Sequence, residues 1–359
     1  MSKTYTEHYD CTKLINSLDA DGQRPAWYIV CSPERGPGKS YQFSKLLLTD
    51  YLENGNKFIL LTRNACDLGT SLAEGTLNSY VKAINSPLKE YEISEKIGVR
   101  NTYSNIYLTH RDGDDVVSEH IGYVVPIRAA SKIKSISSLF YDAQSFFFDE
   151  FQPVSDRDYL HDEFDKLKTI YESIARGEGK ATRYMPIYMS SNTITLQNPY
   201  FVNLGLTTKI QSNTKFYRGR GVVFEMVHVE GLVEEHDNSA FGRSLSSVYK
   251  TRHKSNMWIN DDASLVEKPD NWGRGRYCCT LHAGSDTFGV YVYANGMRYI
   301  SRNIDVTCKY DYNLIVNGSY NRPALMTTSM LQQLRTEFYK GLIRCSDAGV
   351  QKILIDVFA

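Results

Sequence analysis

The sequence lacks several features that would assign a protein to a class directly. No apolar run approaches the ~18 residues of a membrane-spanning helix, and the first residues do not resemble a signal peptide. Seven cysteines occur without a C-x-x-C spacing, which fits a reducing cytoplasm rather than a disulfide framework or a zinc site. Lysine plus arginine and aspartate plus glutamate number 41 each, so the net charge is zero. Any surface for nucleic acid must therefore be local.

A glycine-rich loop between a predicted strand and a predicted helix is the first positive feature. Residues 28–31 are apolar and favour a buried strand, and the apolar residues of 41–53 recur at helical spacing. Between them, residues 33–40 read PERGPGKS. Strand, glycine loop and helix in this order are the context that a phosphate-binding P-loop requires.

This loop supplies the groups that a nucleoside triphosphate needs. Gly36 and Gly38, on either side of Pro37, let backbone N–H groups turn toward the phosphates. The helix N-terminus adds its positive end. Lys39 is placed to reach the β- and γ-phosphates, and Ser40 to hold Mg²⁺. We therefore predict that ATP and Mg²⁺ bind here.

One position departs from the P-loop pattern. Pro33 stands where the first glycine is usual, and proline fixes φ near about −65°, so the start of the loop is more rigid. The alternative interpretation of the whole segment is a chance glycine loop before a helix.

A pair of acidic residues follows a second apolar strand pattern. Residues 145–148 are strongly apolar and end at Asp149 and Glu150. Strand ends of this kind are where open α/β sheets bind ligands. Asp149 would belong to the Mg²⁺ site, and Glu150 would orient and polarise the attacking water, since phosphoryl transfer mainly needs groups to be positioned. The alternative is a strand end with two solvated acids.

Two further residues are candidates for the same site. Residues 185–189 predict another strand, after which Asn192 could sense the γ-phosphate or could be only a turn residue. Arg176 ends a predicted helix over 159–175 and is a candidate arginine finger, although most arginines in such places are surface charges.

The rest of the first part alternates strands and helices. Residues 58–61 predict a strand, 106–108 and 121–127 a hairpin, and 222–229 a final strand. Residues 230–262 are polar with a short helical pattern, and we interpret them as a helical linker with a basic surface. A solvated helix face is the alternative. Its basic residues include Arg243, Lys250, Arg252 and Lys254.

The C-terminal part begins with three strand patterns, over 277–281, 288–293 and 297–301. Asn295-Gly296 is a strong hairpin signal, and a helical pattern follows over 328–343. Such an order could form an RNase H-like fold, whose nucleases need carboxylates on the first strand to bind two metals. The first strand offers none and Asp286 falls in the turn, so we predict that nuclease activity is absent.

Five blocks taken in order resemble the DNA packaging ATPase of small, protein-primed tailed phages, the phi-twenty-nine group. The blocks are RGPGKS at 35–40, FDEF at 148–151, SN at 191–192, NPYF at 198–201 and FGR at 241–243. Their spacing is similar across nearly the whole chain.

The resemblance implies an α/β protein with three domains. These are an additional-strand, conserved-glutamate (ASCE) P-loop ATPase domain over 1–229, a helical linker domain over 230–262 and a vestigial RNase H-like nuclease domain over 263–359. It also implies a homomeric ring, pentameric in this family, that docks on the portal of an empty capsid with a packaging RNA. Such a motor drives double-stranded DNA into the capsid in the host cytoplasm, contacts no membrane and is absent from the mature virion.

The resemblance also implies roles for individual residues. Lys39, Ser40, Asp149 and Glu150 match the family's phosphate, magnesium and acidic groups. Arg35 would contact phosphate, and Arg176 matches a trans-acting arginine finger, although residues 177–180 lengthen its loop. Lys134 matches a lysine proposed to act from the neighbouring subunit.

A neutral chain can grip DNA if each ring subunit lines the pore with a few cations, because phosphate contacts dominate such binding. Lys82 and Lys89 are candidates, together with the basic residues of the linker. Two other functions remain open: a nucleic-acid ATPase such as a terminase with an active nuclease, and a nucleotide-gated structural capsid component.

Overall fold

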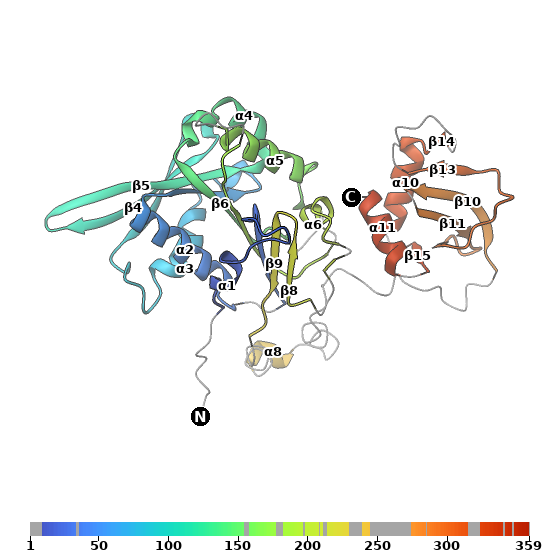
Figure 1. Cartoon of the computed structure of the whole chain (residues 1–359), viewed down its shortest axis with the longest axis horizontal. Coiled ribbons are helices and arrows are strands. Elements are labelled where there is room, and N and C mark those ends of the chain that lie inside the picture. Colours follow the sequence, from blue (N-terminus) through green and yellow to red (C-terminus); the bar gives the residue numbers. More distant parts are fainter. Residues whose placement is uncertain are drawn as a thin grey trace. The chain divides into compact units, whose positions relative to one another are not determined.

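The chain forms two compact units, shown in a computed structural model (Figure 1). The larger comprises the described residues of Met1–Thr195 and Ile210–Ile259, and the smaller those of Leu196–Lys209 and Asn260–Ala359. The structure describes residues 9–33, 36–153, 158–176, 182–196, 198–207, 209–210, 214–229, 239–244, 274–284, 286–314, 324–339, 342–346 and 348–358.

A nine-stranded sheet forms the larger unit, in the order β3-β4-β5-β2-β6-β7-β1-β9-β8. The six strands from β5 to β9 in this order pair in parallel, and β3, β4 and β8 add antiparallel strands at the two edges. The strands are β1 (Trp27–Ser32), β2 (Lys57–Thr62), β3 (Glu92–Ile97), β4 (Ser104–Asp112), β5 (Asp115–Pro126), β6 (Ala143–Asp149), β7 (Ile187–Asn192), β8 (Phe216–Gly219) and β9 (Val222–Met226).

Helices cover both faces of this sheet (Figure 1). Phe147 packs against Phe43 of α2, whereas its neighbour Phe146 packs against Tyr171 of α5, because successive residues of a strand point to opposite faces. The described helices are α1 (Thr12–Ile15), α2 (Lys39–Asn54), α3 (Leu72–Val81), α4 (Ala130–Ser135), α5 (Glu163–Ile174) and α8 (Ala240–Ser244), with short 3₁₀ turns at Ala65–Asp67, Val99–Asn101, Ile127–Ala129 and Ser137–Phe140. Among the described residues, no helix has the length and apolar character to cross a membrane.

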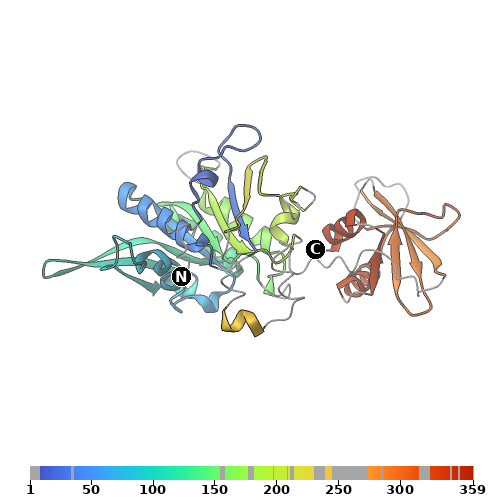
Figure 2. The ribbon, with the colours of Figure 1, turned by 90° about the horizontal axis from the view of Figure 1, so that it is seen from below.

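The predicted hairpin is confirmed and is longer than the pattern indicated. β4 and β5 pair along their whole length from Ser104 to Asp112, and the ribbon extends away from the rest of the sheet (Figures 1 and 2). The turn lies at Gly113, whose φ is 63°.

Two predicted boundaries in the larger unit are wrong at their N-terminal ends. The helix expected over 159–175 begins at Glu163, because Asp162 has a left-handed φ of 54° and the Glu163 carboxylate accepts the Leu160 N–H at 2.9 Å. The strand expected over 185–189 begins at Ile187 and runs through Asn192. Proline has no N–H for a central ladder, which fits the start of β7 just after Pro186.

The last strand predicted for the larger unit, over 222–229, is shorter in the structure. β9 stops at Met226, although the Val227 N–H still donates to the Cys31 carbonyl at 2.8 Å. Of the predicted linker over 230–262, only residues 239–244 are described, and they hold the short helix α8.

The smaller unit contains a six-stranded sheet in the order β14-β13-β10-β11-β12-β15. The three predicted antiparallel strands are confirmed as β10, β11 and β12. The helix expected over 328–343 ends at Tyr339, because Ile343 instead pairs in parallel with Arg298 of β12. Asp286 is the first residue of β11 rather than a turn residue and pairs with Ala283. The elements are β10 (Arg276–Ala283), β11 (Asp286–Val292), β12 (Arg298–Ser301), β13 (Asp311–Asn313), β14 (Ala324–Leu325), β15 (Ile343–Cys345), α6 (Pro199–Asn203), α10 (Thr328–Tyr339) and α11 (Ala348–Phe358).

A half-buried polar network joins β2, β5 and the start of β6. Lys57 Nζ lies 2.7 Å from Asp142 Oδ2 and 3.1 Å from His120 Nδ1, and Tyr123 donates to Asp142 at 2.7 Å. Burial and the charge of Lys57 lower the pKa of His120 below its ordinary value. Burial alone would raise the pKa of Asp142, but the hydrogen bonds from Lys57 and Tyr123 outweigh it and lower that pKa.

The His120 titration predicts a loss of stability in mild acid. The folded-state pKa is lowered, so the unfolded chain takes up the proton first as the pH falls below about 6.5, and stability is lost toward the folded-state pKa. His120→Gln removes this titration. Its denaturant midpoint should therefore fall less than that of the wild type between about pH 7.5 and about pH 5.5. His161→Gln is the control, because the His161 side chain is 89% exposed. Equal slopes for His120→Gln and the wild type would contradict the prediction.

Candidate active site

The described part of the glycine loop has the backbone shape that a phosphate cradle needs. Gly36 and Gly38 have φ values of 83° and 97°, which side-chain-bearing residues adopt only with strain. Gly38 is the N-cap of α2, whose first-turn N–H groups have no acceptor within the helix. The N-terminal segment fixes the loop, since the Tyr9 N–H donates to the Pro37 carbonyl at 2.9 Å. Arg35 lies outside the described residues.

Lys39, the first residue of α2, contacts Asn192, the last residue of β7. Lys39 is only 6% exposed, and its Nζ donates to Asn192 Oδ1 at 3.2 Å. This contact exists because β7 pairs directly with β1, which sets Asn192 opposite Ser32. The structure therefore brings the predicted sensor to the predicted phosphate lysine, and the cation and amide can contact one anion together.

The two acids have different surroundings. One Asp149 oxygen, Oδ1, accepts a hydrogen bond from Ser190 Oγ and one from the Glu150 N–H at 3.1 Å. Glu150 is exposed, and its φ of 50° lies in the left-handed region, which costs a non-glycine residue about 1–2 kcal/mol. Asp149 is thus held in place, whereas the Glu150 side chain is directed by an unusual backbone conformation.

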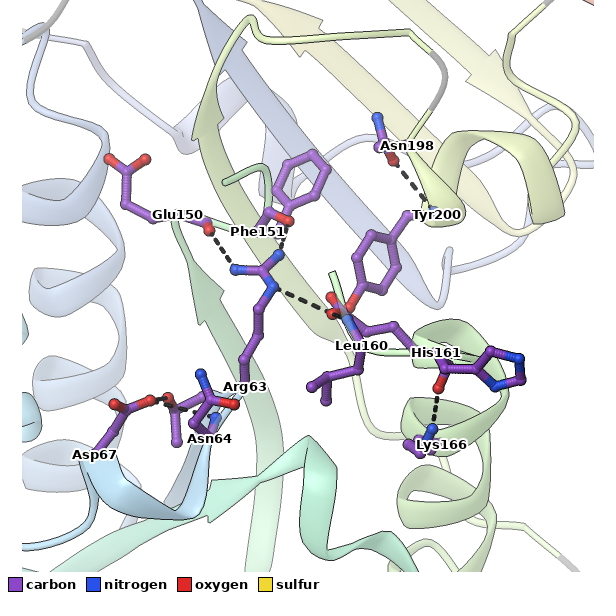
Figure 3. A network of polar contacts seen from close by, with 12 residues as sticks. Arg63, Asn64, Asp67, Glu150, Phe151, Leu160, His161, Lys166, Asn198 and Tyr200 are labelled. Atoms are coloured by element: carbon purple, nitrogen blue, oxygen red, sulfur yellow. Dashed lines mark hydrogen bonds and ion pairs between the residues drawn. The ribbon is translucent and has the colours of Figure 1, made fainter. Parts of the chain in front are cut away.

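Sequence reasoning missed Arg63, which follows β2 and contacts the backbone after β6 (Figure 3). Its Nη1 donates to the Glu150 carbonyl at 3.1 Å, and its Nη2 donates to the Phe151 carbonyl. An arginine after a strand carries no motif, so no signal in the sequence identifies it. Ser190 was also missed, because the sequence pattern ends the strand at residue 189, whereas β7 continues through the Ser-Ser-Asn run.

Open space adjoins the acidic pair on the β2 side. A cavity of about 410 Å³ is lined by Asp149 and Glu150, with Thr62, Arg63 and Asp67 among its other walls. A cavity of this size and polarity has room for several water molecules. A water beside the Glu150 carboxylate is what the predicted role of that residue requires.

Cys31 and Gln152 support the site without offering a reactive group. Gln152 is buried, and its Oε1 accepts the N–H groups of Ile194 at 3.3 Å and Thr195 at 2.9 Å. Its Nε2 donates to Cys31 Sγ at 3.5 Å. Burial raises the pKa of the Cys31 thiol well above its usual range, which disfavours a thiolate near the loop.

The predicted trans-acting cations lie on the other side of the sheet from α2. Lys134 is exposed on α4, which packs against α5, and Arg176 is exposed just after the end of α5. α5 covers the face opposite α2. The structure thus separates these two cations from the helix that carries Lys39.

Three of the predicted DNA-contacting residues are described. The Lys82 ammonium donates to the Lys89 and Tyr91 carbonyls at 3.2 and 2.9 Å, and so bridges the loop that follows α3. Lys89 is exposed. Arg243 is exposed on α8. Lys250, Arg252 and Lys254 lie outside the described residues.

Comparison with known proteins agrees with this arrangement. Residues 23–359 match the Podovirus DNA encapsidation protein (Gp16) family. The chain belongs to this family. DNA packaging is therefore its function, and the family resemblance seen in the sequence is confirmed. A DNA packaging protein of Bacillus phage B103 is 22% identical over 333 residues, which are 90% of this chain and 94% of the relative.

Two solved structures share the fold over almost their whole length. A chain of the bacteriophage Phi-29 viral genome packaging motor assembly gives a TM-score of 0.54 at 19% identity, covering 98% of this chain and 99% of that one. The Phi-28 gp11 DNA packaging motor gives 0.58 at 14% identity, covering 98% and 96%. The mixed α/β fold predicted for the larger unit is confirmed, and its sheet places β7 between the strand before the glycine loop and the strand before the acidic pair. A nuclease ancestry of the smaller unit stays a prediction.

The Ser190–Asp149 contact predicts a change in magnesium dependence. Asp149 is a Mg²⁺ ligand in the prediction from the sequence. Removing a group that orients a metal ligand typically costs about 10–100-fold in metal affinity, so on that prediction Ser190→Ala should need about tenfold more Mg²⁺ for half-maximal nucleotide binding. Ser191→Ala is the matched control, because the Ser191 hydroxyl donates to the neighbouring Asn192 carbonyl instead. Titration of Mg²⁺ with a fluorescent ATP analogue measures both variants. Equal Mg²⁺ midpoints for Ser190→Ala and the wild type would show that the contact does not matter.

Proposed function

We propose that this encapsidation protein is an ATPase whose hydrolysis of ATP drives double-stranded DNA into a preformed capsid. The observation that carries the proposal is the contact of Lys39 with Asn192 at the end of β7, since β7 lies between the strand that precedes the glycine loop and the strand that ends at the acidic pair. A lysine, an amide and two carboxylates at the C-terminal edge of a parallel sheet are the groups that phosphoryl transfer uses.

Each residue then has a chemical role. The backbone at Gly36, Pro37 and Gly38, with Arg35, binds the phosphates, and Lys39 neutralises the charge that grows on the γ-phosphate. Ser40 and Asp149 would hold Mg²⁺, which neutralises phosphate charge when bound. Glu150 orients the attacking water and accepts its proton, and Asn192 contacts the γ-phosphate beside Lys39.

Arg176 and Lys134 act in a neighbouring subunit in this proposal. Their exposure on the face away from α2 supports this, since they can reach another molecule. A homomeric ring, pentameric on the capsid portal, would bring each pair of cations to the next site and so couple hydrolysis to subunit contact. The related Phi-29 chain belongs to a packaging motor assembly, which favours this arrangement.

The remaining partners follow from the same motor. The DNA would be held through its phosphates, so that binding does not depend on the DNA sequence. The residues proposed for these contacts are Lys82, Lys89, Arg243, Lys250, Arg252 and Lys254. We propose that a packaging RNA and the portal hold the ring, and that the protein acts in the host cytoplasm and leaves the finished virion. The smaller unit would be a vestigial nuclease.

Steady-state ATP hydrolysis tests the enzymatic proposal. We expect hydrolysis that rises with empty capsids and double-stranded DNA, and a loss of about 10²–10⁴-fold in Glu150→Gln, the usual contribution of a general base. Glu53→Gln, at an exposed glutamate near the end of α2, is the control and should keep wild-type activity. ATP binding without hydrolysis under any condition would favour the nucleotide-gated capsid component. Robust metal-dependent DNA cleavage would favour a terminase with an active nuclease.

Mixed rings test action in trans. Arg176→Ala should fold and bind ATP but lose about 10³-fold or more in hydrolysis, as expected for an arginine finger. Lys39→Ala subunits cannot hold the phosphates yet still carry Arg176, so mixing the two variants should restore activity. Arg111→Ala, in the exposed part of the β4–β5 hairpin, is the control for loss of a surface arginine. If rings shown by mass spectrometry to contain both variants stay inactive at every ratio, Arg176 does not act in trans.

A further inference from the structure

Arg63 occupies a position from which it can fix the backbone of the predicted catalytic glutamate. Glu150 has a φ of 50°, and the carbonyl groups of Glu150 and Phe151 both accept from the Arg63 guanidinium. A residue other than glycine keeps a left-handed backbone conformation only where the surrounding structure holds it there. The two hydrogen bonds from Arg63 end at the peptide group that follows Glu150 and at the peptide group that follows Phe151.

The guanidinium is itself held from three further directions. Its Nε donates to Glu163 Oε2 at 3.2 Å, and the Glu163 side chain is completely buried. Its Cζ lies 5.0 Å from the centre of the Phe148 ring and 5.2 Å from that of Tyr159. Only 12% of the Arg63 side chain is exposed, so the guanidinium cannot move to another position without losing all of these contacts.

Arg63 does not touch the reacting end of Glu150. Figure 3 shows the Glu150 carboxylate pointing away from the Arg63 guanidinium, which contacts only backbone carbonyls on this segment. The hydrogen bonds of Arg63 to this segment therefore act on the backbone that carries Glu150. Its other anchor, Glu163, is the first residue of α5, and α5 ends just before Arg176.

We infer that Arg63 is a positioning residue, which holds Glu150 in the left-handed conformation that aims its carboxylate at the attacking water and fastens it to the start of α5. This inference rests on the proposed role of Glu150 as the group that activates water. It requires an arginine, because only a planar fork with several fixed N–H donors can reach two carbonyls and a carboxylate at once.

Three substitutions separate positioning from general stabilisation. Arg63→Gln should lower kcat about 100-fold, the effect of a small misplacement of a catalytic group, while the affinity for a fluorescent ATP analogue changes less than about threefold. Arg63→Lys keeps the charge but loses the fork, so it should not restore kcat. Arg24→Gln removes another arginine that stacks on a tyrosine, Tyr184, and should leave both values unchanged.

A folding defect is excluded by a second variant. Glu163 is buried, and Arg63→Gln alone would leave its charge without this partner. The double variant Arg63→Gln/Glu163→Gln removes both charges, and its kcat should be as low as that of Arg63→Gln. Circular dichroism and thermal melting show whether each variant is folded.

The outcomes also separate this inference from the proposed function. Suppose that the wild type hydrolyses ATP and that Glu150→Gln is inactive. If folded Arg63→Gln or the folded double variant then keeps wild-type kcat, the inference about Arg63 is wrong, while the proposed function stands. Recovery of kcat in Arg63→Lys would overturn it as well, because charge alone would then suffice. If the wild type does not hydrolyse ATP, the proposed function fails first.

Discussion

The pairing of β7 with β1 on one side and with β6 on the other is the constraint on which the candidate site depends. In these ladders Asn192 lies opposite Ser32, and Ser190 lies opposite Asp149. The registers of these ladders fix where the three strands end relative to one another, and therefore allow the Lys39–Asn192 and Ser190–Asp149 contacts. Aromatic residues on both faces keep the register, since a slip of one residue would turn Phe146 and Phe147 to the wrong sides. Full burial of one such side chain contributes about 1.5–3 kcal/mol.

Two of the loops at the carboxyl ends of these strands contain residues with a positive φ. Gly36 and Gly38 follow β1, and Glu150 follows β6. Glycine takes this conformation at little cost, whereas Glu150 does so with strain that its neighbours must offset. Arg63 supplies two hydrogen bonds at that point and connects it to Glu163. The loop that carries Lys39 continues into α2, and the segment that carries Glu150 is linked to α5. The helix that begins with Lys39 thus covers one face of the sheet, and α5, which ends just before Arg176, covers the other.

Local patterns predicted the central elements well and their boundaries less well. β1, α2, β2, β6 and the β4–β5 hairpin all coincide with apolar runs or helical spacing that the sequence displays. Edge strands such as β3, with the sequence EISEKI, have few apolar residues, because one face and one edge meet water. The start of α5 was misplaced, since a left-handed Asp162 has no signature in the sequence. Ile343 reads as the end of a helix, and only its pairing with Arg298 makes it a strand.

The sequence by itself determined the chemistry that is present: a glycine loop ending in Lys39 and Ser40, two acids after an apolar strand, and an ordered set of blocks that indicated the packaging family. Each of these is local, so neighbours along the chain suffice to reveal it. Tertiary structure alone decided which strand stands between the loop and the acids, which residue holds the Glu150 backbone, and which serine supports Asp149. These depend on pairings between segments far apart in the chain. Parallel strands impose such neighbours only after the intervening helices have returned the chain to the sheet.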